Sequence, residues 1–365
     1  MGQPAPPSAD PRRRARRARN AIASTVLTLF ALNAGLAAYV HLRPGFRDPL
    51  SDAKVKALVV RFTSVEEPTR VVALGSSRTA AAVEPRSMEA AVAAETGRPC
   101  VAFNMGLQGD GPISQLVHYR RLRDAGVRPD VVIVELLPSA FAWYSDPSRN
   151  EDRPYDATIL RPDRLTRAEL DTVCEYGFPP RETRGEWREA TYNPWFGFRF
   201  QLLARIQPRW LPPGIVQHRK DIGETGGWGP WDPVPPDIAR LRAEEVRQAY
   251  AAQLQAIRIE GPHVEAFEDL LRQCQGDGVR VAVMAPPEGS TFRAWYSPGV
   301  QAALADFEDR LRRDFGVTVL DSRDWLPDEA FVDSHHVVRK WAKPYTERLA
   351  REAVIPSLRT TSGSE

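Results

Sequence analysis

Cysteine, net charge and long apolar runs are all scarce in this 365-residue chain. The three cysteines, Cys100, Cys174 and Cys274, lie far apart, so they form no metal-ligand spacing. One disulfide would still leave a free thiol, and the sequence does not choose the pair. Lys and Arg number 49 against 47 Asp and Glu, a net charge of +2, so we expect neither an acidic partner nor nucleic acid. We also expect no cofactor and no metal.

The single long apolar run, residues 21–40, contains no charged residue. As a helix it would span about 30 Å, the thickness of a bilayer core. Six arginines precede it between positions 12 and 19, and such residues stay on the cytoplasmic side. The sequence therefore predicts a cytoplasmic basic tail at residues 1–20, a single transmembrane helix at 21–42 and an extracytoplasmic (periplasmic) remainder. A signal peptide cleaved near Ala38 and a soluble helix are the alternatives.

The rest of the chain alternates strand-like and helix-like patterns. After a connector at residues 43–68 we expect one domain over 69–357, long enough to bury a substantial core, and a disordered tail at 358–365. Strands are predicted at residues 70–75, 100–105, 131–137, 280–285 and 318–321. Apolar strands that alternate with helices imply a parallel sheet covered on both faces, an α/β fold of the flavodoxin-like three-layer sandwich type.

Residues 141–236 interrupt this alternation as a large insertion. The segment holds many of the prolines and tryptophans and has little regular periodicity, so we expect it to be irregular. It is either a lid or substrate-binding cap, or a purely structural excursion. If it covers the site, the flat rings of Trp195 and Trp228 are suited to stacking on sugars.

Two short motifs roughly 260 residues apart contain the candidate catalytic residues. Gly75-Ser76-Ser77 follows a predicted strand and enters a helix, and Asp333 and His336 lie three residues apart near the end of the domain. A serine hydroxyl becomes a nucleophile when an imidazole removes its proton, and a carboxylate can orient that imidazole. The free N–H groups where a turn enters a helix can hold an oxyanion.

Phosphate binding at the same turn is a weaker alternative. Residues 75–79 lack the Gly-Lys-Ser/Thr ending of a phosphate loop, and no Gly-x-Gly-x-x-Gly follows a strand. A plain turn with a helix N-cap also fits the motif.

Ligands of parallel α/β sheets bind at the carboxyl ends of the strands. The residues that follow the five predicted strands are Ser76 and Ser77, Gly106 to Gly111, Ser139, Glu288, and Asp333 with His336. All of them are therefore predicted to lie on one rim. We expect Ser76, Ser139 and Glu288 to be possible contacts of the site.

These motifs resemble the blocks of SGNH/GDSL-type hydrolases, and the Gly-Ser-Ser form is similar to that of membrane-anchored cell-envelope members, such as D-alanyl transfer and alginate O-acetylation proteins. The resemblance implies that Ser77 is the nucleophile, His336 the base and Asp333 its orienter. It also implies that the N–H groups of Ser77 and Gly109 form the oxyanion hole. Two positions depart from the family pattern. Ser76 replaces an aspartate, and no asparagine follows the third strand, where Ser139 could donate instead.

The resemblance implies a membrane-anchored extracytoplasmic serine esterase or O-acyltransferase. It would act on an envelope or exported polysaccharide, or another acylated envelope substrate, through a seryl ester. The alternative is a catalytically silent SGNH-like binding or scaffold protein of a cell-envelope assembly, which the missing asparagine favours. The oligomeric state is left open.

Overall fold

The computed structural model describes residues 11–146, 151–211 and 222–359. Its centre is a five-stranded parallel sheet in the order β2-β1-β3-β6-β7. The strands are β1 (Thr69–Leu74), β2 (Cys100–Asn104), β3 (Val131–Glu135), β6 (Arg280–Ala285) and β7 (Thr318–Asp321). The order is that of flavodoxin-like sheets, so the predicted fold class is confirmed.

The strands separate two apolar cores because successive side chains point to opposite faces. Val72 and Val132 face one core, whereas Val71 and Val131 face the other. All five residues of β3 are buried. This central strand is therefore covered on both faces, as its continuous apolar sequence predicts.

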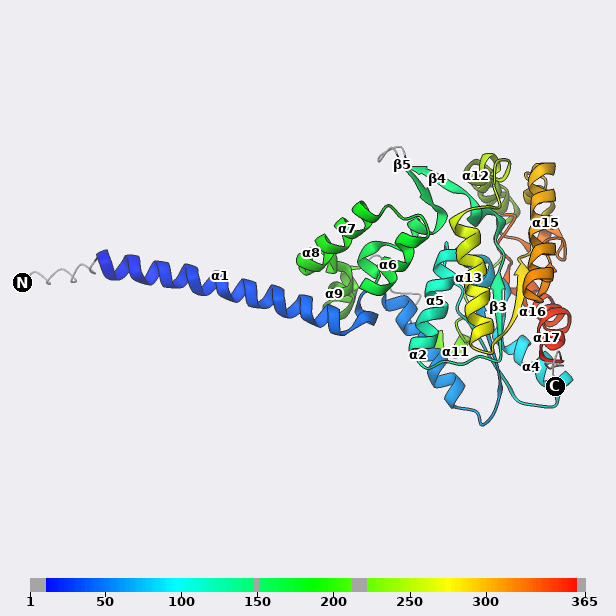
Figure 1. Cartoon of the computed structure of the whole chain (residues 1–365), viewed down its shortest axis with the longest axis horizontal. Helices are drawn as coiled ribbons and strands as arrows, with labels where there is room; N and C mark the ends of the chain where they lie inside the picture. The colour runs from blue at the N-terminus through cyan, green and yellow to red at the C-terminus, as the bar shows by residue number, and fades with distance from the viewer. Residues whose placement is uncertain (1–10, 147–150, 212–221, 360–365) are drawn as a thin grey trace, which may run out of the picture.

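Helices form the two outer layers of the sandwich (Figure 1). The first core receives side chains from α2 (Pro49–Thr63), α5 (Pro112–Asp124), α13 (Pro262–Gly276) and α15 (Pro298–Phe315). The second receives them from α4 (Pro85–Thr96), α16 (Arg339–Leu349), the π-helical turn Ala350–Val354 and α17 (Ile355–Arg359). Because helices cover both faces of the sheet, a ligand can reach it only at its ends. A site is therefore expected at the carboxyl ends of the strands.

The insertion is more regular than its sequence suggests. It contains a hairpin of β4 (Trp143–Asp146) and β5 (Glu151–Pro154), and the helices α6 (Arg167–Glu175), α7 (Pro180–Tyr192), α8 (Pro194–Gly197) and α9 (Arg199–Ile206). A later short helix is α11 (Ile222–Thr225), and α12 (Pro236–Leu254) follows it. Helices α6, α7 and α8 begin at local signals, namely the Thr166 capping box and N-terminal prolines. The shortest of the helices, such as α8 with four residues, cannot show a clear apolar period. Residues 147–150 and 212–221 lie outside the described residues, as do residues 1–10 of the predicted tail at 1–20 and residues 360–365 of the predicted tail at 358–365.

The N-terminal helix α1 (Pro11–Leu42) extends away from the sheet (Figure 1). It is long and apolar enough, by length and composition, to cross a membrane. Its C-terminal part touches the body, where Leu36 and Val40 pack with Phe46 and Phe198.

Candidate active site

Ser77 lies on a tight turn between β1 and the short helix α3 (Ser77–Ala82). Gly75 makes the turn possible, with φ +158° and no room for a side chain. A Cβ there would lie 2.3 Å from Thr79 Oγ1 and 2.7 Å from Glu135 Cβ. Ser76 caps α3, because its hydroxyl accepts a hydrogen bond from Arg78 N–H at 3.1 Å. Ser77 is therefore the first helical residue, and its N–H has no partner within the helix.

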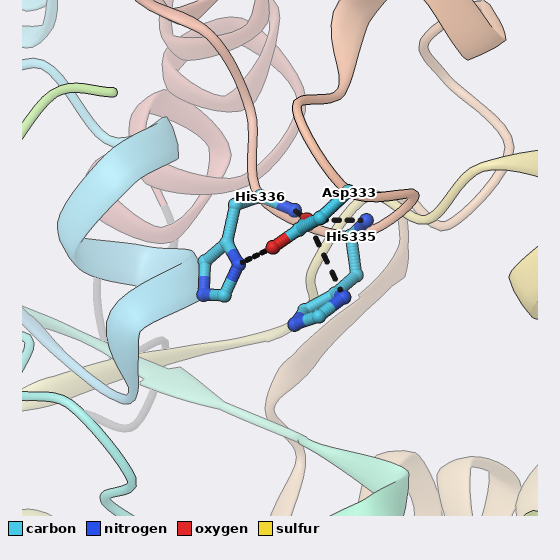
Figure 2. A group of neighbouring side chains, drawn as sticks. All are labelled: Asp333, His335 and His336. Carbon is cyan, nitrogen blue, oxygen red and sulfur yellow. Dashed lines mark hydrogen bonds and ion pairs between the residues drawn. The ribbon is translucent and has the colours of Figure 1, made fainter. Parts of the chain in front are cut away.

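Ser77, His336 and Asp333 form one continuous hydrogen-bonded chain. His336 Nε2 lies 2.8 Å from Ser77 Oγ, and His336 Nδ1 lies 2.6 Å from Asp333 Oδ2. The other oxygen, Asp333 Oδ1, accepts hydrogen bonds from the backbone N–H groups of His335 (3.2 Å) and His336 (2.8 Å). Figure 2 shows Asp333 between the two imidazoles. The predicted approach of the two motifs across the sequence is confirmed.

The turn Asp333–His336 is shaped so that the carboxylate folds back on its own backbone. Ser334 has φ +76°, a left-handed conformation that is uncommon for a residue with a side chain. Burial tends to raise the pKa of Asp333, but the hydrogen bond from His336 and the two neighbouring imidazoles hold that pKa well below its usual range. Asp333 is therefore ionised at neutral pH, and it favours the His336 tautomer with a proton on Nδ1 and an acceptor at Nε2.

His335 lies behind the hydrogen-bonded chain and is 4% exposed. Its ring packs against Phe292 and the edge of Tyr250, with centroids 5.3 and 5.7 Å away. Burial, followed by His336 and Arg78, lowers the pKa of His335 well below its usual value. This ring is therefore neutral, and its contacts make it a packing residue.

Replacing His335 with alanine is therefore expected to act mainly on stability. The cavity left between Phe292 and Tyr250 should lower the free energy of unfolding by about 2 kcal/mol. In contrast, His336→Ala should remove ester cleavage with a smaller effect on unfolding. Denaturant titrations of both variants, paired with kcat, measure the difference. Equal losses of kcat in two folded variants would contradict it.

Asp333, His335 and His336 could also supply atoms to a metal ion, because three of their ligand atoms lie within 4.8 Å of one another. Asp333 and His336 Nδ1 are already joined by a hydrogen bond, and His336 Nε2 contacts Ser77. His335 Nδ1 has no hydrogen-bond partner among the described residues. A metal held by all three would therefore compete with the Asp333–His336 bond.

Glu135, at the end of β3, holds the turn that carries Ser76 and Ser77. The sequence does not single this residue out. Its carboxylate accepts hydrogen bonds from the Ser76 backbone N–H and, at 3.0 Å, from the Ser76 hydroxyl. Burial raises the pKa of Glu135 from 4.5 to about 7, although the two bonds from Ser76 and the Arg78 charge oppose this. Glu135 thus binds Ser76, the residue that stands where the SGNH/GDSL pattern has an aspartate.

The raised pKa of Glu135 makes stability depend on pH. The folded state keeps a proton that the unfolded chain releases, so this contribution to stability is complete below pH 4.5 and is lost as pH rises to about 7. We expect Glu135→Gln to remove this fall, which amounts to up to about 3 kcal/mol. The measurement is the difference in unfolding free energy between wild type and variant from pH 4 to 8. A difference that does not change with pH would rule out the titration of Glu135 in this range.

Arg78 and Glu288 form a buried ion pair next to Ser77. Arg78 Nη1 lies 2.7 Å from Glu288 Oε1, and the two side chains are 4% and 0% exposed. Tyr296 donates its hydroxyl to the same oxygen at 2.8 Å, and the guanidinium lies 4.5 Å from the centre of the Phe292 ring. Glu288 therefore anchors the helix that carries Ser77, through Arg78. The sequence places Glu288 on the correct rim but does not identify its partner.

The segment that follows β2, residues 106–111, packs against the turn of Ser77 through Gly106. A Cβ on Gly106 would lie 2.7 Å from Ala80 N and 2.9 Å from Ser76 O, so only glycine fits. Its N–H is occupied, since it donates to Asn104 Oδ1 at 2.9 Å. Gly109 has φ +79°, and a Cβ there would meet Ile159. A role for Gly109 N–H in an oxyanion hole stays a prediction.

Two further residues that the sequence does not mark hold this segment in place. Asn104 Nδ2 donates to the Thr79 carbonyl of α3 at 2.8 Å and to the carbonyl of Val83, just after α3, at 2.7 Å. Lys54, from α2, donates to the carbonyls of Asn104, Gly106 and Gly227 at 3.1, 2.7 and 3.0 Å. Burial lowers the pKa of Lys54 to about 7, although Asp110 opposes this. Both side chains satisfy carbonyls that no sequence pattern marks.

Ser139 lies just after β3 in the turn Pro138–Phe141. It is 1% exposed, and its hydroxyl has no hydrogen-bond partner within residues 11–146, 151–211 and 222–359. The hydroxyl is thus not bonded to Ser77, and donation to an oxyanion stays a prediction.

The end of the insertion reaches the His336 imidazole. Trp231 stacks on His336 with ring centroids 4.8 Å apart and an angle of 21° between the planes. Backbone contacts fix this position, since Trp231 pairs with Val338 and accepts a hydrogen bond from Arg339 N–H at 2.8 Å. Trp228 instead uses Nε1 to donate to the Ala81 carbonyl at 2.8 Å. The insertion thus forms one wall of the site, and the ring that contacts His336 is that of Trp231, not that of Trp228.

Trp195, the other tryptophan expected to stack on sugars, lies beside α1. It lines a cavity together with Leu29, Leu32 and Asn33. Its contacts therefore place it near the apolar helix and not with Trp231 at His336.

Comparisons with known proteins leave the family open. No protein-family model matches the chain, and no curated protein matches it. Among solved structures, a chain from Bacteroides fragilis NCTC 9343, described as a "putative acylhydrolase", is 8% identical, with a TM-score of 0.35. The match covers 81% of this chain and 93% of that one. A likeness at this level carries no argument about function, which has to come from the site.

Proposed function

We propose that this protein is a serine esterase or O-acyltransferase whose nucleophile is Ser77. The observation that carries the proposal is the hydrogen-bonded chain from Ser77 Oγ through His336 to Asp333. The three residue types, their order and their distances are those that acyl transfer through a seryl ester requires.

The reaction follows from this geometry. Ser77 Oγ attacks the ester carbonyl while His336 Nε2 takes its proton, and the new imidazolium is stabilised by ionised Asp333. The oxyanion of the tetrahedral intermediate accepts from Ser77 N–H, with Gly109 N–H as the proposed second donor. His336 then protonates the departing alcohol, which leaves an ester on Ser77. Water or an acceptor alcohol, deprotonated by His336, attacks that ester and releases Ser77.

The proposed substrate is an acylated polysaccharide, or another acylated substrate, of the cell envelope. Trp231 supports this choice, because it presents a flat aromatic ring beside the catalytic imidazole.

Labelling with a fluorophosphonate tests the proposal. The reagent should form one adduct, on the peptide that contains Ser77, and phenylmethylsulfonyl fluoride should block it. Ser77→Ala should lose the adduct, whereas Ser139→Ala should keep it. The second candidate, a silent binding protein, is favoured by the missing asparagine. It would be supported if folded wild-type protein gave no adduct and cleaved no aryl acetate.

The proposed location is extracytoplasmic, with α1 as an uncleaved anchor. The six arginines at positions 12–19 support an N-terminus in the cytoplasm. Protease added to cells with a permeabilised outer barrier should degrade residues after Arg43 and spare the N-terminal arginines. The reverse pattern would place the catalytic domain inside, and a mature chain that begins near Ala38 would identify a signal peptide.

A further inference from the structure

The described residues carry an exposed apolar surface on α8, α9 and their flanks. Outside α1, nine large hydrophobic side chains are exposed, and six of them lie between positions 192 and 210. These six, which we call the α8–α9 patch, are Tyr192, Trp195, Phe196, Phe200, Ile206 and Trp210. Their exposed fractions reach 76% for Tyr192 and 72% for Trp210. Exposed apolar residues that are scattered singly need no partner, whereas a cluster of them marks an interaction surface.

The patch lies beside the apolar helix α1 (Figure 1). Asn33, in the middle of the apolar run, donates its side-chain N–H to the Tyr192 carbonyl at 3.0 Å. Trp195 shares a cavity of about 400 Å³ with Leu29 and Leu32. Phe198, between the exposed members of the patch, is itself buried in the cluster that includes Val40. The patch is therefore attached to α1 along its C-terminal half.

The position of these contacts along α1 indicates what covers the patch. Leu32 lies eight residues before Val40, the end of the apolar run, and Leu29 lies eleven before it. At 1.5 Å per residue these positions are about 12 and 16 Å from that end, near the middle of a bilayer core about 30 Å thick. If α1 spans a membrane over residues 21–40, Trp195 lies at the depth of the outer leaflet. This depth for Trp195 rests on the proposed membrane anchor and does not depend on the proposed catalytic activity.

The charges of the segment fit a lipid surface. Residues 190–211 contain three arginines and no aspartate or glutamate. The Arg199 guanidinium lies 4.1 and 4.6 Å from the ring centres of Phe196 and Phe200, and Arg205 lies 4.4 Å from that of Phe46. Aromatic rings with arginines beside them are typical of membrane interfaces, where the rings enter the acyl region and the guanidinium groups reach the phosphates.

We propose that the α8–α9 patch inserts into the outer leaflet of the membrane that α1 crosses. The occupant is the phospholipid of that leaflet, with acyl chains against the aromatic rings and headgroup phosphates near Arg199 and Arg205. The catalytic domain would then be held at two places, α1 and the patch. A helix alone would leave the domain free to rotate, whereas two attachments fix its orientation to the membrane.

Photo-crosslinking of the full chain in phospholipid nanodiscs tests the proposal. The probe is phosphatidylglycerol with a diazirine in one acyl chain, and the adducts are mapped by mass spectrometry. We expect adducts on peptides from α1 and from residues 194–210, and none on α12, where Ile238 and Leu241 are also exposed. Adducts confined to α1 would overturn the proposal and point to a protein partner for the patch. No adduct on α1 would instead refute the membrane anchor.

A pair of matched variants separates lipid contact from simple proximity. Phe196→Ser with Phe200→Ser should reduce patch adducts at least about threefold and leave α1 adducts unchanged, because both rings are exposed and their loss does not open the core. Ile238→Ser with Leu241→Ser should change neither yield. Melting temperatures within a degree or two of wild type would verify folding. Unchanged patch adducts in the phenylalanine variant would overturn the proposal.

Discussion

Replacing Ser77 with alanine is expected to lower kcat for ester cleavage on the order of 10⁴-fold or more. The reason is the hydrogen-bonded chain itself. Ser77 Oγ has His336 Nε2 at 2.8 Å to take its proton, and no other hydroxyl is hydrogen-bonded to that nitrogen among the described residues. His336→Ala should cost a similar factor, because the alcohol of Ser77 is a weak nucleophile without a base. The measurement is steady-state hydrolysis of an aryl acetate.

The double variant provides the sharper test. Residues that act as one unit are strongly non-additive, so Ser77→Ala with His336→Ala should be no slower than either single variant. If the two losses multiply, the residues contribute independently and the proposed mechanism is wrong. Asp333→Asn keeps the size of the side chain but favours the other imidazole tautomer, and it should also lower kcat by orders of magnitude. Unchanged unfolding curves exclude misfolding as the cause.

The arrangement of the sheet could be predicted from the sequence because its signals are local and strong. The run Val131–Glu135 is apolar almost throughout, so it predicts a strand buried on both faces. A parallel sheet places the carboxyl ends of its strands on one rim, so the predicted strands place Ser77 and His336 on the same rim. Helix α15 also has clear local signals, since Ser297 caps its start and Gly316 its end.

The supporting contacts of the site could not be predicted because they join residues that are distant in the sequence. Glu135 looked like the polar end of an apolar strand, and only the fold brings it under Ser76, 59 positions earlier. The insertion contains several tryptophans, and nothing in the sequence distinguishes Trp231 from Trp195 and Trp228, the two that are expected at the site. Which of these rings reaches His336 depends on the backbone pairing of Trp231 with Val338, for which the sequence has no signal.

Replacing Glu288 with alanine should have the largest effect on stability, a loss of about 3–5 kcal/mol in the free energy of unfolding. Burial acts to lower the pKa of Arg78, but the adjacent Glu288 carboxylate raises it above its usual value, so the guanidinium stays charged. Without Glu288, that charge would remain buried and would lose its ion-pair partner. Removal of the Arg78 anchor should also displace Ser77, so kcat should fall together with stability.

The matched controls are a surface ion pair and a double variant. Glu352→Ala breaks the pair with Arg348, whose side chains are 42% and 45% exposed, and it should change the free energy of unfolding by less than about 0.5 kcal/mol. Arg78→Met with Glu288→Leu replaces both buried charges by apolar groups, so it should recover most of the stability that Glu288→Ala loses. Urea titrations of the four proteins, wild type included, measure these differences. If Glu288→Ala unfolds like Glu352→Ala, the Arg78 guanidinium reaches solvent in the variant, and the pair does not anchor the helix that carries Ser77.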